Sequence, residues 1–305
     1  MASSLRNVVI VGAGGNLGPH VLKAFLSADE FRVTVLSRDS STSVFPEGVP
    51  VIRSDYSHES LVSAFRDQDA VISVVGRGGY AAQQKLVDAA LAAGVKRFIP
   101  AEFGNNSADE RVRALAPMLE GKKAKVDYLR AREDQMSWTT VITGAFFDYA
   151  LKIGFLGFNL QTHEATIYDD GVIPASVSTF SQIGRALVAI LRHAELTKNQ
   201  YVYVESFTVT QNEVLAALER ATGGEKWAVQ RVDLKPLIEE STERFNQGDL
   251  AGARILNLAA GLGRFPDGPY GDWSRVPGGS WNARLGLEVE ELDQVVQSVV
   301  QSVVQ

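Results

Sequence analysis

Short apolar runs alternate with amphipathic stretches over the first half of the chain. The runs VVIV (8–11) and AVISVV (70–75) are apolar without alternation, which is typical of parallel strands covered on both faces. Strands are predicted at Asn7–Val11, Arg32–Ser37, Val51–Ser54, Ala70–Val75, Arg97–Pro100 and Trp138–Thr143. Helical patterns fall between them at Leu17–Ser27, Glu59–Phe65, Ala81–Ala93 and Glu120–Asp134. This alternation predicts an α/β fold with a doubly wound parallel sheet and right-handed crossovers.

The pattern changes after Gly144. The segment ATIYDDGVIPAS predicts a hairpin that turns at residues 169–171. An amphipathic helix (FSQIGRALVAILRH) and a strand (YVYVE) follow, and then a second helix that ends at Gly223 and Gly224. The tail QVVQSVVQSVVQ repeats every four residues. It predicts a terminal helix with a valine stripe, which serves either internal packing or a helical contact between copies.

Composition narrows the class of protein. Of 305 residues, 45% are hydrophobic and 22% charged, with a formal net charge of −6 and no dense Lys/Arg segment, which argues against nucleic acid as a partner. The absence of cysteine excludes disulfides and thiolate chemistry. No apolar run has the length of a membrane span, and the segment MASSLRN does not resemble a signal peptide. The expectation is a cytoplasmic protein without membrane contact.

The turn between the first strand and the first helix carries the candidate chemistry. The stretch VVIVGAGGNLGPHVLKAFL places Gly12, Gly15 and Gly18 three residues apart, which is a dinucleotide-binding spacing. Gly12 permits the tight turn, Gly15 lets the backbone approach a pyrophosphate, and Gly18 is expected to let the helix pack closely on the sheet. The phosphates would lie at the positive end of the helix dipole. Leu17 occupies the third glycine position of the strict G-x-G-x-x-G motif, so that motif is not met.

The end of the second strand selects between dinucleotides. It reads Ser37-Arg38-Asp39-Ser40, and a guanidinium beside hydroxyl groups suits the 2′-phosphate of NADP(H). Asp39 supports the competing interpretation, because a carboxylate there can accept from the ribose hydroxyls of NAD. Arg38 favours NADP(H).

Four further segments resemble one protein family. They are VKRFIPAEFG (95–104), GKKAKVDYLRARE (121–133), TVITGAFFDY (140–149) and FTVTQNEVLAAL (207–218). Together with the glycine turn they resemble the NmrA-like and isoflavone-reductase-like group of atypical short-chain reductases. That group includes phenylcoumaran benzylic ether reductases and pinoresinol–lariciresinol reductases. The chain departs from the plant members by reading PAEFG for PSEFG, and by Asp127-Tyr128 where they have arginines.

The resemblance implies an NADP-binding Rossmann domain (1–150) and a smaller α+β substrate-binding region (151–305) interleaved with it. It also implies positions for the site residues. The pyrophosphate would lie against Gly12, Gly15, Asn16, Leu17 and Gly18, and the 2′-phosphate against Arg38. The adenosine would lie against Ser73, Val74 and Gly76, with Gln83 reaching the cofactor from its helix. The nicotinamide side would be bordered by Glu102 and Phe103, and the pocket wall formed by Gly144, Phe146 and Phe147.

The family's lysine falls on Lys123. Reduction of a carbonyl, an enone or a benzylic ether requires a proton to move, and a partly desolvated lysine beside a cationic nicotinamide is suited to that step. The usual Tyr-x-x-x-Lys signature is absent. The alternative is that Lys123 belongs to an exposed helix face. Glu102 is either a general acid/base or a helix-capping carboxylate.

The expected function is therefore NADPH-dependent reduction of a small aromatic or alkaloid-like metabolite, with the proton supplied through Lys123 or water. Aromatic residues beside the expected cleft favour a flat or polycyclic substrate, if they face it. The alternatives are a non-redox rearrangement with bound NADP, and a dinucleotide-sensing regulator without turnover. A homodimer is compatible with the sequence. No metal site is expected, because His163 stands alone.

Overall fold

A computed structural model describes residues 5–263 and 265–304. Its centre is a seven-stranded parallel sheet in the order β10-β6-β5-β4-β1-β2-β3. The strands are Asn7–Val11 (β1), Arg32–Arg38 (β2), Val51–Ser54 (β3), Ala70–Ser73 (β4), Arg97–Ile99 (β5), Ser137–Ile142 (β6) and Gln200–Tyr203 (β10). β1 lies between β2 and β4, with Val8 opposite both Val33 and Ala70. The predicted doubly wound sheet is confirmed, and this order is that of a Rossmann-type fold.

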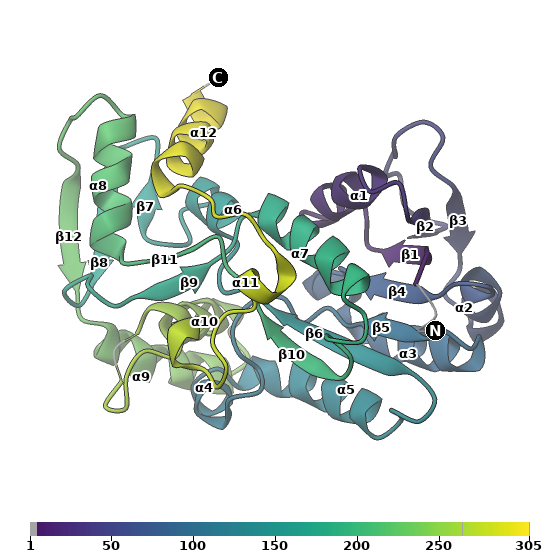
Figure 1. Ribbon diagram of the computed structural model, residues 1–305. Coiled ribbons are helices and arrows are strands. Elements are labelled where there is room, and N and C mark those ends of the chain that lie inside the picture. The colour runs from purple at the N-terminus through teal and green to yellow at the C-terminus, as the bar shows by residue number, and fades with distance from the viewer. Residues whose placement is uncertain (1–4, 264, 305) are drawn as a thin grey trace.

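Helices cover both faces of this sheet, and the side chains of β1 show why its sequence is continuously apolar. Val8 and Ile10 pack in one buried cluster, and Val9 and Val11 in another. The first cluster includes α1 (Gly18–Leu26) and α7 (Phe180–Arg192), which lie side by side in Figure 1. The second includes α2 (His58–Phe65), α3 (Gln83–Ala92) and α5 (Glu120–Arg130). Successive residues of a strand point to opposite faces, so each β1 residue meets a helical layer.

The chain returns to the sheet after leaving it. The sequence pattern groups α7 and β10 with the second half of the chain, but β10 pairs with β6 in parallel, Tyr201 opposite Thr140. α7 packs against α1 closely enough that a Cβ on Gly184 would lie 2.9 Å from the carbonyl oxygen of His20. The two regions are therefore interleaved.

A smaller α+β unit lies beside the sheet (Figure 1). Its strands are Phe158–Asn159 (β7), Glu164–Tyr168 (β8), Ala175–Val177 (β9), Phe207–Val209 (β11) and Ala228–Val232 (β12). Its helices are Phe147–Lys152 (α6), Gln211–Ala221 (α8) and Leu292–Val304 (α12). The remaining α-helices of the described residues are Glu110–Leu115 (α4), Leu234–Asn246 (α9), Leu250–Leu262 (α10) and Asn282–Leu285 (α11), and short 3₁₀ helices span Arg77–Ala82, Pro117–Leu119 and Trp273–Arg275. α10 packs against α9, α4 and β9, so it adjoins both units.

The predicted hairpin at residues 169–171 is wrong. The turn itself forms, with Gly171 at φ +70° and its N–H donating to the Tyr168 carbonyl. The two strands that flank it do not pair, however. β8 pairs with β7 and β12, whereas β9 pairs with β11. The local pattern identified a turn but not the long-range partners of the strands.

The terminal valine stripe packs within the chain. Val296, Val299 and Val300 are buried, and α12 lies against α8 and α6. Internal packing therefore accounts for this repeat. No helix within the described ranges is both long and apolar enough to cross a bilayer.

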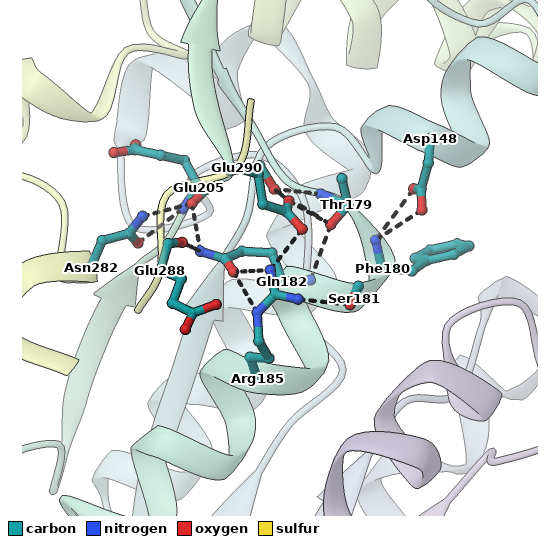
Figure 2. Close-up of polar contacts among 11 residues, drawn as sticks. Asp148, Thr179, Phe180, Ser181, Gln182, Arg185, Glu205, Asn282, Glu288 and Glu290 are labelled. Carbon is teal, nitrogen blue, oxygen red and sulfur yellow. Dashed lines mark hydrogen bonds and ion pairs between the residues drawn. The ribbon is translucent and has the colours of Figure 1, made fainter. Parts of the chain in front are cut away.

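A polar network fastens the segment before α12 to the start of α7 (Figure 2). Glu290 accepts hydrogen bonds from Thr179 Oγ1 at 2.8 Å and from Ser206 Oγ, and pairs with Arg185 at 2.6 Å. Gln182 Nε2 donates to the Glu205 and Glu288 carbonyls. Burial raises the pKa of Glu290, but the bonds from Ser206, Arg185 and Thr179 outweigh it and leave that pKa lowered.

Replacing Glu290 with glutamine is expected to destabilise the protein by about 1–3 kcal/mol at neutral pH, because a buried charge-assisted network is lost. A lowered folded-state pKa contributes stability above the unfolded pKa near 4.3, and that contribution disappears as pH falls through the folded value. The difference in free energy of unfolding between wild type and E290Q should therefore shrink below about pH 4. Chemical denaturation across pH tests this; a difference independent of pH would contradict it.

Candidate active site

The glycine turn forms a backbone cradle at the carboxyl end of β1. Gly12 has φ +91°, and a Cβ there would lie 2.9 Å from the Val75 nitrogen and 3.0 Å from the Val74 carbonyl carbon and oxygen. Gly15 is exposed, its N–H donates to the Gly12 carbonyl, and the nearest atom to an added Cβ is that same oxygen at 3.3 Å. Gly12 is thus required by the protein itself, whereas Gly15 leaves space for a ligand.

Glycine is required at position 18 for a different reason from the expected close packing of the helix on the sheet. A Cβ at Gly18 would overlap the carbonyl oxygens of Gly12 and Ala13, which belong to the turn and not to the sheet. Gly18 therefore lets the turn fold back against the first residue of α1. Asn16 beside it is exposed and Leu17 is buried. The start of α1, with its positive dipole end, therefore lies next to the open face of Gly15.

Two buried side chains near the ends of β4 and β5 have polar atoms without partners among the described residues. Ser73 Oγ, at the last residue of β4 and opposite Val11, has no hydrogen-bond partner within the ranges that the structure describes. Gln83, the first residue of α3, accepts from the Ala101 N–H at 2.9 Å through Oε1, while its Nε2 has no partner in the same part of the chain. Both residues are 0% exposed. Buried polar atoms are normally satisfied, so these two are exceptions that a bound molecule at this edge of the sheet would explain. Their neighbours Val74 and Gly76 are buried and exposed, respectively.

Arg38 lies exposed at the last residue of β2. Within the described residues it has no ion-pair partner. Asp39 beside it is also exposed. The geometry leaves both side chains at the same edge of the sheet.

The PAEFG segment after β5 encloses a buried carboxyl group. Glu102 is 0% exposed and accepts from Ser107 Oγ through Oε2, while its Oε1 has no partner among the residues that the structure describes. Burial raises the pKa of Glu102, although the charge of Lys122 opposes this. The carboxyl does not cap a helix, so the capping interpretation is not supported. The next residue, Phe103, is buried and packs in the core cluster that contains α1 and α7.

Lys122 is the residue that the sequence-based analysis missed here. Its Nζ donates to the main-chain carbonyl of Glu102 at 2.5 Å and to that of Phe103 at 3.0 Å. Burial lowers the pKa of Lys122, against the charge of Glu102. In the sequence this residue is one of three nearby lysines, and no local signal separates it from the others.

Lys123 points in another direction, and its Nζ bonds both carboxylate oxygens of Asp127 at 2.5 and 2.6 Å. The Lys123 side chain is 22% exposed, so it is not a fully solvated surface residue. Asp127 is one of the positions at which the sequence departs from the resemblance described above. The structure therefore pairs the expected proton donor with a carboxylate of its own helix.

Gly144 and the two phenylalanines after it take separate positions. A Cβ at Gly144 (φ +63°) would overlap the Ser176 carbonyl oxygen, so the segment after β6 can approach β9 this closely only with glycine at this position. Phe146 is half-buried, its ring 5.2 Å from that of Phe180. Phe147 is fully buried and packs edge-on against Phe207 in the core of the smaller unit, so its packing does not support a place in a pocket wall.

A cavity of about 40 Å³ lies between the two units. The walls come from the Gly104 and Gly144 loops, β9 and α10, and include Asn105, Phe155, Ser176, Asn257 and Gly261. Asn105 Nδ2 donates to the Asn257 carbonyl at 2.7 Å, which holds α10 over the cavity. The sequence pattern did not indicate that α10 lines a cavity, because the small apolar residues of this helix are typical of ordinary core packing.

The sheet order, the cradle at β1 and the cavity between two units define a Rossmann-type protein with a dinucleotide-type turn. The model of the NmrA-like family matches residues 5–240. The chain belongs to the NmrA-like family.

Relatives and solved structures agree with this assignment. The chain is 39% identical over 297 residues to "Oxidoreductase aprR" of Aspergillus flavus, covering 96% of this chain and 98% of that protein. It is 32% identical over 240 residues to "Isoflavone reductase homolog IRL" of Zea mays, covering 73% and 76%. Among solved structures, the leucoanthocyanidin reductase–NADPH complex of Vitis vinifera superposes with a TM-score of 0.76 at 19% identity, covering 97% and 99%. At that identity the structural likeness supports the fold alone.

Proposed function

We propose that this protein is an NADPH-dependent reductase of a small aromatic or alkaloid-like metabolite. The supporting observation is the cradle at Gly15 together with two unpartnered buried polar atoms, Ser73 Oγ and Gln83 Nε2, at the same edge of the sheet. In a parallel α/β sheet this edge is where nucleotide cofactors bind. The relatives named as oxidoreductase and isoflavone reductase homolog support the same class of reaction.

The residues fit the cofactor in three regions. Gly12, Gly15, Asn16, Leu17 and Gly18 would hold the pyrophosphate, and Arg38 the 2′-phosphate. Ser73, Val74, Gly76 and Gln83 would border the adenosine and ribose. Glu102, Phe103 and Gly144 would border the nicotinamide side. When bound, NADPH supplies the hydride from C4 of its nicotinamide.

The remaining chemistry belongs to the chain. Lys123 is proposed to deliver the proton, directly or through water, with Asp127 orienting its ammonium group. Glu102 would be a second candidate proton donor, because burial raises its pKa and so favours the protonated form. The cavity walls, with Phe155 among them, are largely apolar and would suit an aromatic ring, but at about 40 Å³ the cavity is smaller than such a substrate, so its walls would have to move apart on binding. Phe146 would border the pocket entrance.

The test is calorimetric titration with NADPH, NADP⁺ and NADH, followed by turnover with a panel of aromatic metabolites while the nicotinamide absorbance is recorded. Tight binding of both phosphorylated forms, and a loss of absorbance matched by reduced product, are expected. Substrate conversion without change in absorbance would indicate a rearrangement instead, and binding without any conversion would indicate a sensing regulator.

A further inference from the structure

The segment that follows β2 is held in place by a side chain from the neighbouring strand. Arg53 of β3 stands opposite Ser37 in the register of the sheet. Its Nη1 donates to the carbonyl oxygen of Ser41 at 2.7 Å, to that of Arg38 at 3.2 Å and to Ser37 Oγ at 3.3 Å. Its Nη2 lies 3.4 Å from the carbonyl oxygen of Ser43. One guanidinium therefore spans residues 37–43.

All of these acceptors are neutral. Within the described residues neither Arg53 nor Arg38 has a carboxylate within ion-pair distance. The Asp55 carboxylate nearby accepts from the Ser57 N–H instead. Two guanidinium groups without an ion pair within the described residues thus lie at one edge of the sheet, where Asp39 and Asp55 also lie. Such a pair favours a dianion, because each interaction with a doubly charged group is stronger than with a neutral hydroxyl.

The segment braced by Arg53 also adjoins the glycine turn. A Cβ at Gly14 would overlap Ser43 Oγ and lie 2.7 Å from Ser43 Cβ. Within the segment, Ser41 Oγ donates to Ser43 Oγ at 3.2 Å and accepts from the Ser43 N–H at 3.3 Å. The hydroxyl-rich stretch Ser40-Ser41-Thr42-Ser43 is therefore shaped on one side by Arg53 and on the other by the pyrophosphate cradle.

We propose that Arg53 is a positioning residue that sets this protein's preference for a 2′-phosphorylated dinucleotide over the unphosphorylated one. It fixes the main chain of residues 38–43, so that Arg38 and the serine hydroxyls face one phosphate monoester, and it adds a second positive charge there. This inference rests on the proposed NADP(H) binding. A purely structural brace would instead affect both dinucleotides alike, or stability alone.

The test is calorimetric titration of wild type, R53Q, R53K and R32Q with NADP⁺ and with NAD⁺, alongside thermal unfolding. R32Q is the matched control, because Arg32 is an exposed arginine at the opposite end of β2. R53Q is expected to weaken NADP⁺ binding about tenfold or more, the effect of losing a charge-assisted interaction, and NAD⁺ binding less than about threefold. R53K is expected to bind NADP⁺ at least about threefold more weakly than wild type, since an ammonium group cannot span the same acceptors. R32Q should match wild type.

The outcomes separate the two proposals. Wild type that binds neither NADP⁺ nor NADPH overturns the proposed function and this inference with it. Wild type that binds NADP⁺, with R53Q weakening both dinucleotides equally or neither, overturns the role of Arg53 alone. R53K with wild-type NADP⁺ affinity would show that charge without positioning suffices, which also overturns it.

Discussion

Gly15→Ala is expected to fold like the wild type and to lose most of its affinity for NADP(H), by about 10- to 100-fold. The added methyl group meets only the Gly12 carbonyl at 3.3 Å, and Gly15 does not require a positive φ. It would, however, occupy the space through which a pyrophosphate reaches the N–H groups of the turn, and each lost hydrogen bond to a charged group costs about 1.5–3 kcal/mol.

Gly12→Ala is the matched variant for this prediction. Its methyl group would meet the Val74–Val75 backbone within 3.0 Å at a φ of +91°, so a loss of about 3 kcal/mol in the free energy of unfolding is expected as well as loss of binding. Calorimetry and chemical denaturation measure the two effects separately. Wild-type affinity in G15A would mean that the phosphates do not lie at this turn.

Lys123→Met is expected to lower kcat by about 10²- to 10⁴-fold with little change in stability. A positioned proton donor contributes a factor of that size, whereas a helix-surface pair such as Lys123–Asp127 stabilises a protein by only about 0.3–0.5 kcal/mol. The measurement is steady-state turnover with a substrate found in the metabolite panel, together with thermal unfolding.

Lys122→Met is expected to lower the free energy of unfolding more than it lowers kcat. It removes the ammonium group that binds the Glu102 and Phe103 carbonyls, so the protein should lose about 1–3 kcal/mol of stability. K125M is the control on the same helix, because Lys125 Nζ donates to the side-chain oxygen of Gln84 at 3.1 Å. If K123M turns over at the wild-type rate, the proton comes from elsewhere.

Much of the sheet could be predicted from the sequence because its signals are local. The predicted limits of the first six strands lie within two residues of the observed ones, and the continuous apolar run of β1 follows from two helical layers that each bury alternate residues. The glycine turn was equally visible, because a strand, three spaced glycines and a helix are adjacent in the chain.

The site was less predictable, since its residues come together from distant segments. Glu102 and Lys122 are twenty positions apart, and nothing in either segment reveals that one ammonium group binds the main chain beside the other residue's carboxyl group. The sequence predicts a pocket position equally for Phe146 and Phe147, because they are adjacent and of the same residue type. The turn into α6 nevertheless directs Phe147 into the core, where it packs against Phe207. The direction of a side chain depends on the backbone at its own position, which a sequence pattern does not specify.

By itself, the sequence determined the parallel α/β sheet, the cradle at its first crossover and the kinship with the reductase group, because periodicity, glycine spacing and motifs are properties of neighbouring residues. Only the tertiary structure decided that β10 returns to the first sheet, that β8 pairs with β12 and not with β9, and that Arg53 braces the segment after β2. Those outcomes depend on which distant surfaces bury one another and which buried donors find acceptors, and both are settled only when the whole chain has folded.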